Sequence, residues 1–163
     1  MDVRLEAEIE VAAKPVAIFD AVNDAAGAPH IYAGHGPVPA VTEMRYEGDG
    51  KPKLNAVRKV HTADGNVLVE QLVVYDRPRA HSYTLRGFSP PFSLLIREAR
   101  ADWRFDEMAG AVATRVHWTY TFTLTTPLVW PVAALFLHTV FHGWMLGCLG
   151  RARREVVTTG GLI

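Results

Sequence analysis

The sequence has very little cysteine and no excess of charge of either sign. Cys148 is the only cysteine among 163 residues, so an intramolecular disulfide framework and a cysteine-rich zinc or iron–sulfur site are excluded, and a reducing compartment is expected. Lys and Arg number 17, and Asp and Glu also number 17, which removes the overall basic field of a general nucleic-acid binder. We therefore expect no nucleic-acid partner.

The sequence also lacks internal repeats, low-complexity tracts and a linker. Its first ten residues, MDVRLEAEIE, are acidic and alternate in hydrophobicity, whereas a signal peptide is basic and then apolar. A chain of this length with 49% hydrophobic residues fits one domain. We therefore expect a single cytoplasmic domain over residues 1–158 and a disordered C-terminal tail over residues 159–163.

One segment, from Leu128 to Leu149, contains no Asp, Glu, Lys or Arg and is long enough to span a membrane. Pro131, His138 and His142 lower its hydrophobicity, and the strands before it need an apolar cover. We favour a buried helix that continues to about residue 157 and bends near Pro131. Membrane contact stays open as the less favoured alternative.

Most of the preceding chain alternates apolar and polar residues, which is the period of a half-buried strand. Residues 3–11, 95–106 and 116–124 show this pattern most clearly, and Pro15 stands where the first turn of a helix tolerates proline. At most one short helical turn fits into residues 28–40. The predicted order is a strand, a helical region, six antiparallel strands and a long C-terminal helix.

Asp64-Gly65 is a strong signal for a two-residue hairpin turn between residues 54–62 and 67–75. In that register Lys59 faces Glu70 as an exposed ion pair, which removes Glu70 as a candidate catalytic base. Arg58 and Gln71 then share the inner face with a row of apolar side chains: Leu54, Ala56, Val60, Val67, Val69, Val73 and Tyr75.

The later strands add further candidates to the inner face. Alternation places Arg97 inward, where a buried guanidinium needs an anion, a carbonyl-rich ligand or a carboxylate. If the connection between the strands at 95–106 and 116–124 is centred between residues 109 and 110, Ala101 lies opposite Trp118. A small residue opposite a large one indicates either tight packing or room for a ligand beside an aromatic wall. Packing in the core and a position at the sheet rim are the alternatives to ligand contact. The candidate ligand-binding residues are Arg58, Gln71, Tyr83, Arg97, Trp103, Trp118, Tyr120 and Phe122.

His138 and His142 are four residues apart and share one face of the predicted C-terminal helix. They are the candidate acid–base residues, and the alternative is that each bonds a backbone carbonyl or lies at a wet edge. A zinc site is not favoured, because Thr139 stands where a zincin has its glutamate and no third ligand is near in sequence. We expect no metal and no cofactor.

Several short motifs follow one another in a recognisable order: residues 16–20, the run from Glu70 through Asp76 and Pro78 to Tyr83, Trp103 with Phe105, residues 114–118, and Pro127-Leu128 with Pro131. This order resembles the helix-grip superfamily of START, Bet v 1 and polyketide cyclase/dehydrase-like proteins, often written SRPBCC, and within it the polyketide cyclase/dehydrase-like branch. The resemblance covers residues 3–157. It implies an α+β fold in which a curved, antiparallel, seven-stranded sheet wraps around a long C-terminal helix.

The same resemblance implies a cavity between the sheet and the helix that takes a polyketide, a lipid or an aromatic metabolite. The leading interpretation is a carrier or sensor that binds such a hydrophobic small molecule. The alternatives are a polyketide cyclase/dehydratase-type enzyme without a metal, which would use pocket His, Tyr and Arg residues, and a membrane-associated module. The sequence does not decide whether the protein is an enzyme, and a homodimer stays open.

Overall fold

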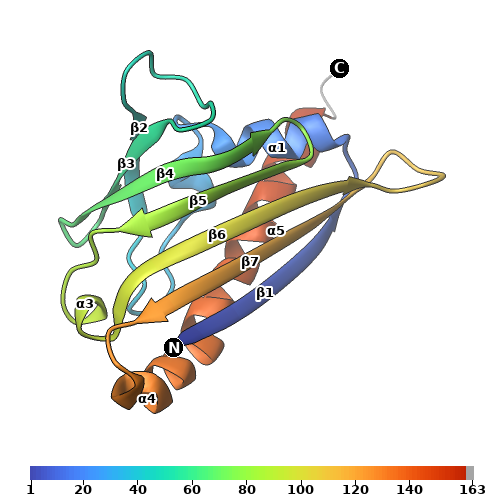
Figure 1. Cartoon of the computed structure of the whole chain (residues 1–163). Helices are drawn as coiled ribbons and strands as arrows, with labels where there is room; N and C mark the ends of the chain where they lie inside the picture. Colours follow the sequence, from blue (N-terminus) through green and yellow to red (C-terminus); the bar gives the residue numbers. More distant parts are fainter. Residues whose placement is uncertain (161–163) are drawn as a thin grey trace.

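Seven antiparallel strands form one curved sheet that wraps around the C-terminal helix (Figure 1). The computed structural model describes residues 1–160. Along the sheet the strand order is β1-β7-β6-β5-β4-β3-β2. The strands are β1 (Asp2–Val11), β2 (Val41–Tyr46), β3 (Val57–Thr62), β4 (Val67–Asp76), β5 (Ala80–Arg86), β6 (Ile96–Glu107) and β7 (Thr114–Leu124). The predicted α+β helix-grip fold is confirmed.

The helices lie on the concave side of the sheet and at its ends (Figure 1). Helices α1 (Pro15–Asn23) and α2 (Ala28–Ile31) follow β1, and α3 (Phe92–Leu95) precedes β6. The C-terminal helical segment consists of η1 (Pro127–Val129), α4 (Trp130–Phe136), the π-helical turn η2 (Leu137–Phe141) and α5 (His142–Gly160). Residues 159 and 160, which were expected in a tail, belong to α5, and the rest of that tail lies outside the described residues.

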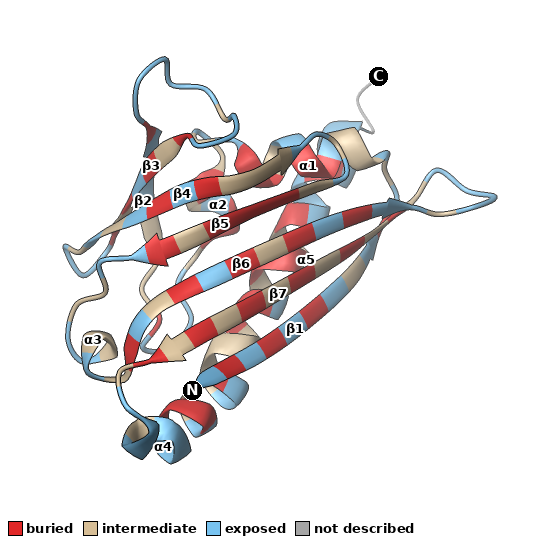
Figure 2. Cartoon of the chain, viewed as in Figure 1, coloured by how far each residue is buried: buried red, intermediate tan, exposed pale blue. Residues whose placement is uncertain are grey.

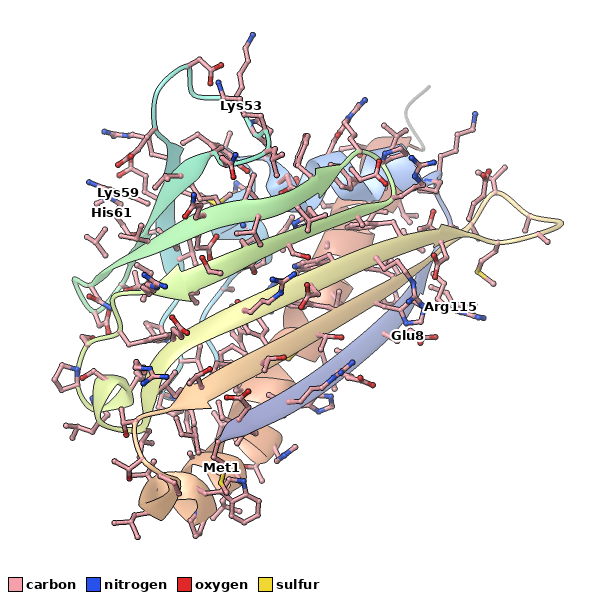
Figure 3. All side chains as sticks on the ribbon, viewed as in Figure 1. Met1, Glu8, Lys53, Lys59, His61 and Arg115 are labelled. Carbon is pink, nitrogen blue, oxygen red and sulfur yellow. The ribbon has the colours of Figure 1, made fainter. Side chains whose placement is uncertain are left out.

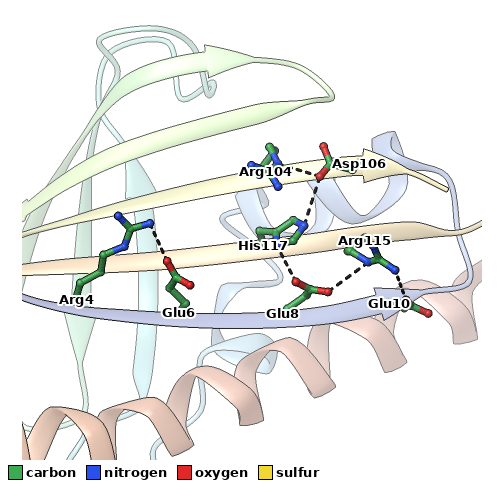
Figure 4. Close-up of polar contacts among 8 residues, drawn as sticks. All are labelled: Arg4, Glu6, Glu8, Glu10, Arg104, Asp106, Arg115 and His117. Atoms are coloured by element: carbon green, nitrogen blue, oxygen red, sulfur yellow. Dashed lines mark hydrogen bonds and ion pairs between the residues drawn. The ribbon is translucent and has the colours of Figure 1, made fainter.

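The two faces of the sheet follow the predicted alternation in most strands (Figure 2). On the outer face of β1, β7 and β6, charged side chains pair across strands (Figure 4): Arg115 Nη2 lies 2.8 Å from Glu10 Oε1, and His117 Nδ1 lies 3.0 Å from Glu8 Oε2. Exposed pairs of this kind contribute at most about 1 kcal/mol each. Their main effect is to keep the outer face solvated, so that the apolar rows must face α5.

The inner face of β6 and β7 carries a stacked aromatic cluster. Trp103 and Trp118 face each other across the two strands, with ring centroids 4.2 Å apart. The expected partner of Trp118 was Ala101, which instead faces Tyr120. The connection between the strands is centred one residue later than predicted, and this shifts the register by two residues. A shift by two leaves every side chain on its predicted face.

The β3–β4 hairpin differs from the prediction by one residue. Its loop holds three residues, 63–65, because Thr62 donates its backbone N–H to the carbonyl of Asn66, and Gly65 adopts the left-handed region with φ of 85°. The Asp64 carboxylate accepts hydrogen bonds from Thr62 Oγ1 and the Asn66 N–H, which stabilises this longer loop.

This one-residue shift exchanges the two faces of β4. Glu70 is buried opposite Arg58, whereas Gln71 and Val69 are exposed. The predictions that Gln71 and Val69 face inward and that Lys59 pairs with Glu70 are wrong. Lys59 lies on the outer side of β3, with its Nζ 3.4 Å from Glu47 (Figure 3).

The inward prediction for Arg97 is also wrong. The pairing of β6 with β7 is interrupted by a bulge between Ile96 and Glu98, where two residues of β6 occupy the space of one. Ile96 and Ala99 both point inward, and Arg97 is exposed. The bulge thus places an unexpected apolar side chain on the inner face and a cation on the surface.

His81 of β5 is buried inside the aromatic cluster without a polar partner. Its ring stacks on Trp103 at 5.5 Å and meets the edge of Phe19 at 5.3 Å, and neither ring nitrogen has a hydrogen-bond partner among the described residues. Burial, and to a smaller extent the charge of Arg58, lowers the pKa of His81 well below its usual value of 6.5. The folded protein therefore holds this ring neutral.

The unfolded chain protonates the His81 ring readily below about pH 6.5, whereas the folded protein does not. The free energy of unfolding should therefore fall as the pH falls below the unfolded pKa of about 6.5. In His81→Phe this contribution is absent. Between about pH 7.5 and about pH 5.5, the free energy of unfolding of the wild type should fall by about 1.4 kcal/mol more than that of the variant. Urea unfolding at both pH values measures the difference. Phe105→Leu, a change in the same cluster without a titratable group, should keep the wild-type pH dependence, and equal slopes for the wild type and His81→Phe would contradict the assignment.

Candidate functional site: an apolar cavity with a polar end

A cavity of about 100 Å³ lies between the sheet and the C-terminal helix. Its walls are mainly aliphatic and aromatic, and they come from strands β2 to β7, from α3, from neighbouring loops and from the C-terminal helical segment. The apolar lining residues include Val38, Val41, Met44, Val60, Leu68, Leu85, Phe88, Phe92, Ile96, Phe122, Phe141 and Trp144. Partly or fully exposed loop residues mark the open end: Pro39, Asp64, Asn66, Phe88 and Ser89.

The loop between α2 and β2 covers the cavity from the side of the helix. Trp144 of α5 lines the cavity and donates its indole N–H to the carbonyl of Ala33 at 2.9 Å. His35 packs so closely on Gly143 that a Cβ there would lie 2.9 Å from its Nε2. The glycine in α5 therefore allows the loop to approach the helix, and the loop places Val38 and Pro39 in the cavity wall.

A buried ion pair forms the polar end of the cavity. Arg58 and Glu70 face each other across β3 and β4, and their side chains are 3% and 9% exposed. Arg58 donates from Nε to Glu70 and from Nη1 to the Tyr46 hydroxyl at 2.8 Å. Its guanidinium lies 4.7 Å from the centre of the Tyr83 ring, within the range of a cation–π contact. A charge with this many partners can be buried without the full cost of desolvation.

Further hydrogen bonds tie this ion pair to the first helix. Tyr46 donates its hydroxyl to the carbonyl of Asn23 at 2.9 Å, and Arg58 Nη1 lies 3.4 Å from Asn23 Oδ1. Asn23 in turn donates its side-chain amide to the carbonyl of Phe19. The last turn of α1 is thus fixed against β2 and β3 by polar contacts that surround Arg58.

Two tyrosines place their hydroxyls next to the ion pair. The Oη atoms of Tyr83 and Tyr120 are 3.2 Å apart, and both residues line the cavity. Burial raises the pKa of both phenols well above the usual value of 10.0, and nearby charges and phenols, Glu70 among them, raise it further. Both hydroxyls therefore stay protonated at neutral pH. Their mutual bond uses one of the two hydrogens, which leaves the other available for a ligand.

Arg58 keeps its charge in this environment. Burial acts to lower the pKa of the guanidinium, but the Glu70 carboxylate and the phenols of Tyr46 and Tyr83 outweigh it, so that the pKa lies well above its usual range. The polar end thus presents a cation and a free phenolic O–H to whatever enters the cavity. This combination suits a carbonyl, carboxylate or phenol oxygen.

The structure brings half of the predicted ligand-binding residues together. Arg58, Tyr83, Tyr120 and Phe122 line the cavity. Trp103 and Trp118 are buried in the aromatic cluster behind the cavity wall and do not line it. Gln71 and Arg97 are exposed, for the reasons of register and bulge given above.

The two predicted acid–base histidines lie outside the cavity. His138 is exposed on the helix, and His142 donates its Nε2–H to the carbonyl of Glu6 at 2.9 Å. For His142 this confirms the alternative given above, in which a helix histidine bonds a backbone carbonyl. Their shared face is directed toward the edge strand β1 and solvent, so neither histidine can reach a ligand at Arg58.

Sequence reasoning missed several lining residues. Glu70 was excluded through the wrong hairpin register, although a loop with glycine at its third position is the usual signal for a three-residue hairpin. Phe141 and Trp144, three residues apart on the helix, form its contribution to the cavity wall. Tyr32, whose hydroxyl donates to the carbonyl of Val22, comes from a loop that carries no periodic signal.

No cluster of three or more His, Cys, Asp or Glu side chains with metal-binding geometry occurs within residues 1–160. Cys148 is buried in α5, and burial raises the pKa of its thiol to about 12. The thiol is therefore protonated at neutral pH and unsuited to act as a nucleophile.

The geometry, a sheet curved around a long helix with an apolar cavity between them, is that of the helix-grip ligand-binding proteins. Residues 2–157 match the family model described as polyketide cyclase / dehydrase and lipid transport, and the chain belongs to this family. Membership supports hydrophobic ligand binding or a polyketide cyclase role in general terms. Among curated protein sequences no relative matches the chain.

Solved structures with the same fold have low sequence identity to this chain. The Zhui aromatase/cyclase from Streptomyces sp. R1128 is 15% identical with a TM-score of 0.73, over 96% of this chain and 94% of that one. A truncated norcoclaurine synthase from Thalictrum flavum is 13% identical with a TM-score of 0.71, again over 96% and 94%. The structure of Ara h 8.0201 is 15% identical with a TM-score of 0.68, over 97% and 99%. At these identities the likeness establishes the fold.

The buried ion pair can be tested by a double-mutant cycle. Glu70→Leu leaves the Arg58 guanidinium buried without its counter-charge and should lower the free energy of unfolding by about 3–5 kcal/mol. The double variant Arg58→Met/Glu70→Leu removes both charges and should recover most of that loss. Urea unfolding at neutral pH measures each variant. The cycle also includes the single variant Arg58→Met. If the loss in the double variant equals the sum of the losses in the two single variants, the side chains are not coupled.

Proposed function

We propose that the protein binds a hydrophobic small molecule, a polyketide, lipid or aromatic metabolite, in the cavity between sheet and helix and acts as its carrier or sensor. The observation that carries this proposal is the contrast between the mainly apolar walls and the buried polar end at Arg58. Arg58 and the free hydroxyl hydrogen of the Tyr83–Tyr120 pair can bind one oxygen of a ligand, while Phe122 and Trp144 contact its apolar part. Such sites combine a mostly apolar lining with a few placed polar groups.

The cavity volume restricts the ligand. About 100 Å³ is on the scale of engineered apolar cavities that take a single aromatic ring. A larger molecule would place one ring, or the end of one chain, at the polar end and extend toward the loops at the open end. The α2–β2 loop and α3 border that opening and would have to move apart for a bulky ligand.

A polyketide cyclase or dehydratase is the second candidate, favoured by the same donors. A guanidinium and a phenolic O–H next to a carbonyl oxygen can stabilise the enolate that forms during cyclisation. The carrier is preferred because an enzyme also needs a base near the ligand. Glu70 already accepts from Arg58, and His138 and His142 lie outside the cavity.

Ligand binding can be tested through the two tyrosines. Native mass spectrometry of the purified protein identifies any co-purified apolar molecule, and calorimetric titration with 2-naphthol, an apolar ring system with one hydroxyl, provides a defined probe. Tyr83→Phe alone should weaken binding little, because the Tyr120 hydroxyl becomes free to donate. The double variant Tyr83→Phe/Tyr120→Phe removes both donors and should weaken binding by about 1–2 kcal/mol.

Arg97→Ala is the matched control, because it removes an exposed arginine from the same sheet and should leave the affinity for 2-naphthol unchanged. If the wild type and the double tyrosine variant bind 2-naphthol with equal affinity, the two hydroxyls do not contact the ligand and the polar end is not part of the binding site.

The carrier and the enzyme can be separated with the co-purified ligand. A carrier should return the ligand with its mass unchanged after prolonged incubation. An enzyme should release a product that has lost the mass of water through cyclisation with dehydration, and Arg58→Met should abolish this turnover more strongly than it weakens binding. High-resolution mass spectrometry of the extracted ligand gives the answer.

A further inference from the structure

A group of large apolar side chains is exposed at one end of the molecule. Leu128 is 90% exposed, Trp130 46%, Val132 62% and Leu135 68%, all on η1 and α4, and Leu94 of α3 is 67% exposed. We call these five residues the apolar tip. Single exposed apolar residues need no explanation, but a group on adjacent elements marks an interaction surface.

The tip is exposed because α4 extends beyond the sheet. β1 begins at Asp2 and β7 ends at Leu124, so no strand lies next to α4, and Figure 1 shows this helix projecting past the end of the sheet. The helix from Pro127 to Gly160 contains an 18-residue window that is long and apolar enough to cross a membrane, and only 39% of that window is buried. The fold thus covers α5 and buries Ala133 and Ala134 of α4, but it leaves the outer side of α4 without an apolar partner.

The two elements of the tip form one surface. Thr125 donates its hydroxyl to the carbonyl of Leu94 at 2.8 Å, which fixes α3 against the start of η1. The rings of Phe92 and Phe136 lie 5.4 Å apart and join α3 to the end of α4. Phe92 also lines the cavity, so the tip borders the cavity wall near its opening.

The charges around the tip are sparse and differ from those of the outer sheet. Residues 126–150 contain no Asp, Glu, Lys or Arg. Close to Leu94 lies Arg97, which the bulge turns outward and which has no ion-pair partner among the described residues. The neighbouring Glu98 is already paired with Arg86 at 3.2 Å. An apolar ridge with a tryptophan and an adjacent unpaired cation complements a membrane interface that holds anionic headgroups.

We propose that the apolar tip docks on a lipid bilayer, with Leu128, Val132 and Leu135 inserted at the headgroup boundary and Arg97 next to anionic headgroups. This inference rests on the proposed function, because docking at the tip brings the cavity opening to the membrane in which a hydrophobic ligand dissolves. The surface is thus an entry or delivery point for the ligand. A second copy of the chain is the competing occupant, and it offers no charge complementary to Arg97 on its own tip.

The experiment is flotation of the full chain with phosphatidylcholine vesicles, with and without phosphatidylglycerol. The wild type should float with the anionic vesicles, and Leu128→Ser/Leu135→Ser should lower the partition coefficient by at least about tenfold, because both side chains lose their lipid contact. Arg97→Gln should weaken binding several-fold to the anionic vesicles only. The emission of Trp130 should shift to the blue on binding, and the shift should be absent in Trp130→Phe.

The matched control is Val112→Ser/Leu54→Ser, which removes two exposed apolar side chains, 66% and 55% exposed, from loops outside the tip. It should float as the wild type does. Equal flotation of the tip variant and this control would overturn the proposal. Light scattering provides a second test. The proposal would also be overturned if the wild type is a dimer, the tip variant is a monomer and neither protein floats with vesicles.

Failure of the docking surface and failure of the cavity are distinguishable. The tip variant should bind 2-naphthol in solution with wild-type affinity, since none of its changed residues lines the cavity. Tyr83→Phe/Tyr120→Phe should in turn float with vesicles as the wild type does. If the wild type floats with anionic vesicles but does not bind 2-naphthol, only the cavity proposal is rejected. If the wild type binds 2-naphthol but does not float, only the tip proposal is rejected.

Discussion

The interior of this protein is organised around one buried charge. The Arg58 side chain is almost fully buried, so the residues around it must supply a counter-charge and hydrogen-bond acceptors. Glu70 supplies the charge from β4, the Tyr46 hydroxyl accepts from β2, and Asn23 lies at the end of α1. The pair therefore links helix α1 to three neighbouring strands and requires that β3 and β4 meet in one register only, because a shift by one residue would bury a lone cation.

The same charge makes one end of the cavity polar. Tyr83 packs its ring against the guanidinium and shares a hydrogen bond with Tyr120, and burial keeps both phenols protonated. The cation and the two phenols therefore lie at the inner end of the cavity, and most of its walls are apolar. On the proposed function, a ligand with one oxygen and an apolar body would bind with its oxygen toward Arg58, which suits a carrier and would also suit an enzyme of the same family.

The C-terminal helix contributes to two different surfaces along its length. Its α5 part is covered by the sheet and supplies Trp144 to the cavity. Its α4 part continues beyond the last strand, where nothing in the described chain covers Leu128 or Leu135. A helix that extends beyond the sheet that it covers, and that carries no charged residue before Arg151, thus produces a packed core along α5 and an apolar tip at α4 next to the cavity opening. Cavity and tip are joined through Phe92 and Phe136.

Local periodicity determined the element order, the inner faces of β1, β6 and β7 and the long helix, because alternation and helical spacing are properties of neighbouring residues. It also placed Tyr83 and Tyr120 inward. The partner of Arg58 was decided only by the tertiary structure. A three-residue loop that Asp64 stabilises moved Glu70 inward and Gln71 outward, and a bulge at Ile96 turned Arg97 to the surface. One residue more or less in a turn exchanges the two faces of the strand that follows it, and one extra residue in a bulge does so locally. The energy of either depends on contacts between strands that no short stretch of sequence contains. The positions of His138 and His142 were likewise set by which edge of the sheet the helix packs against.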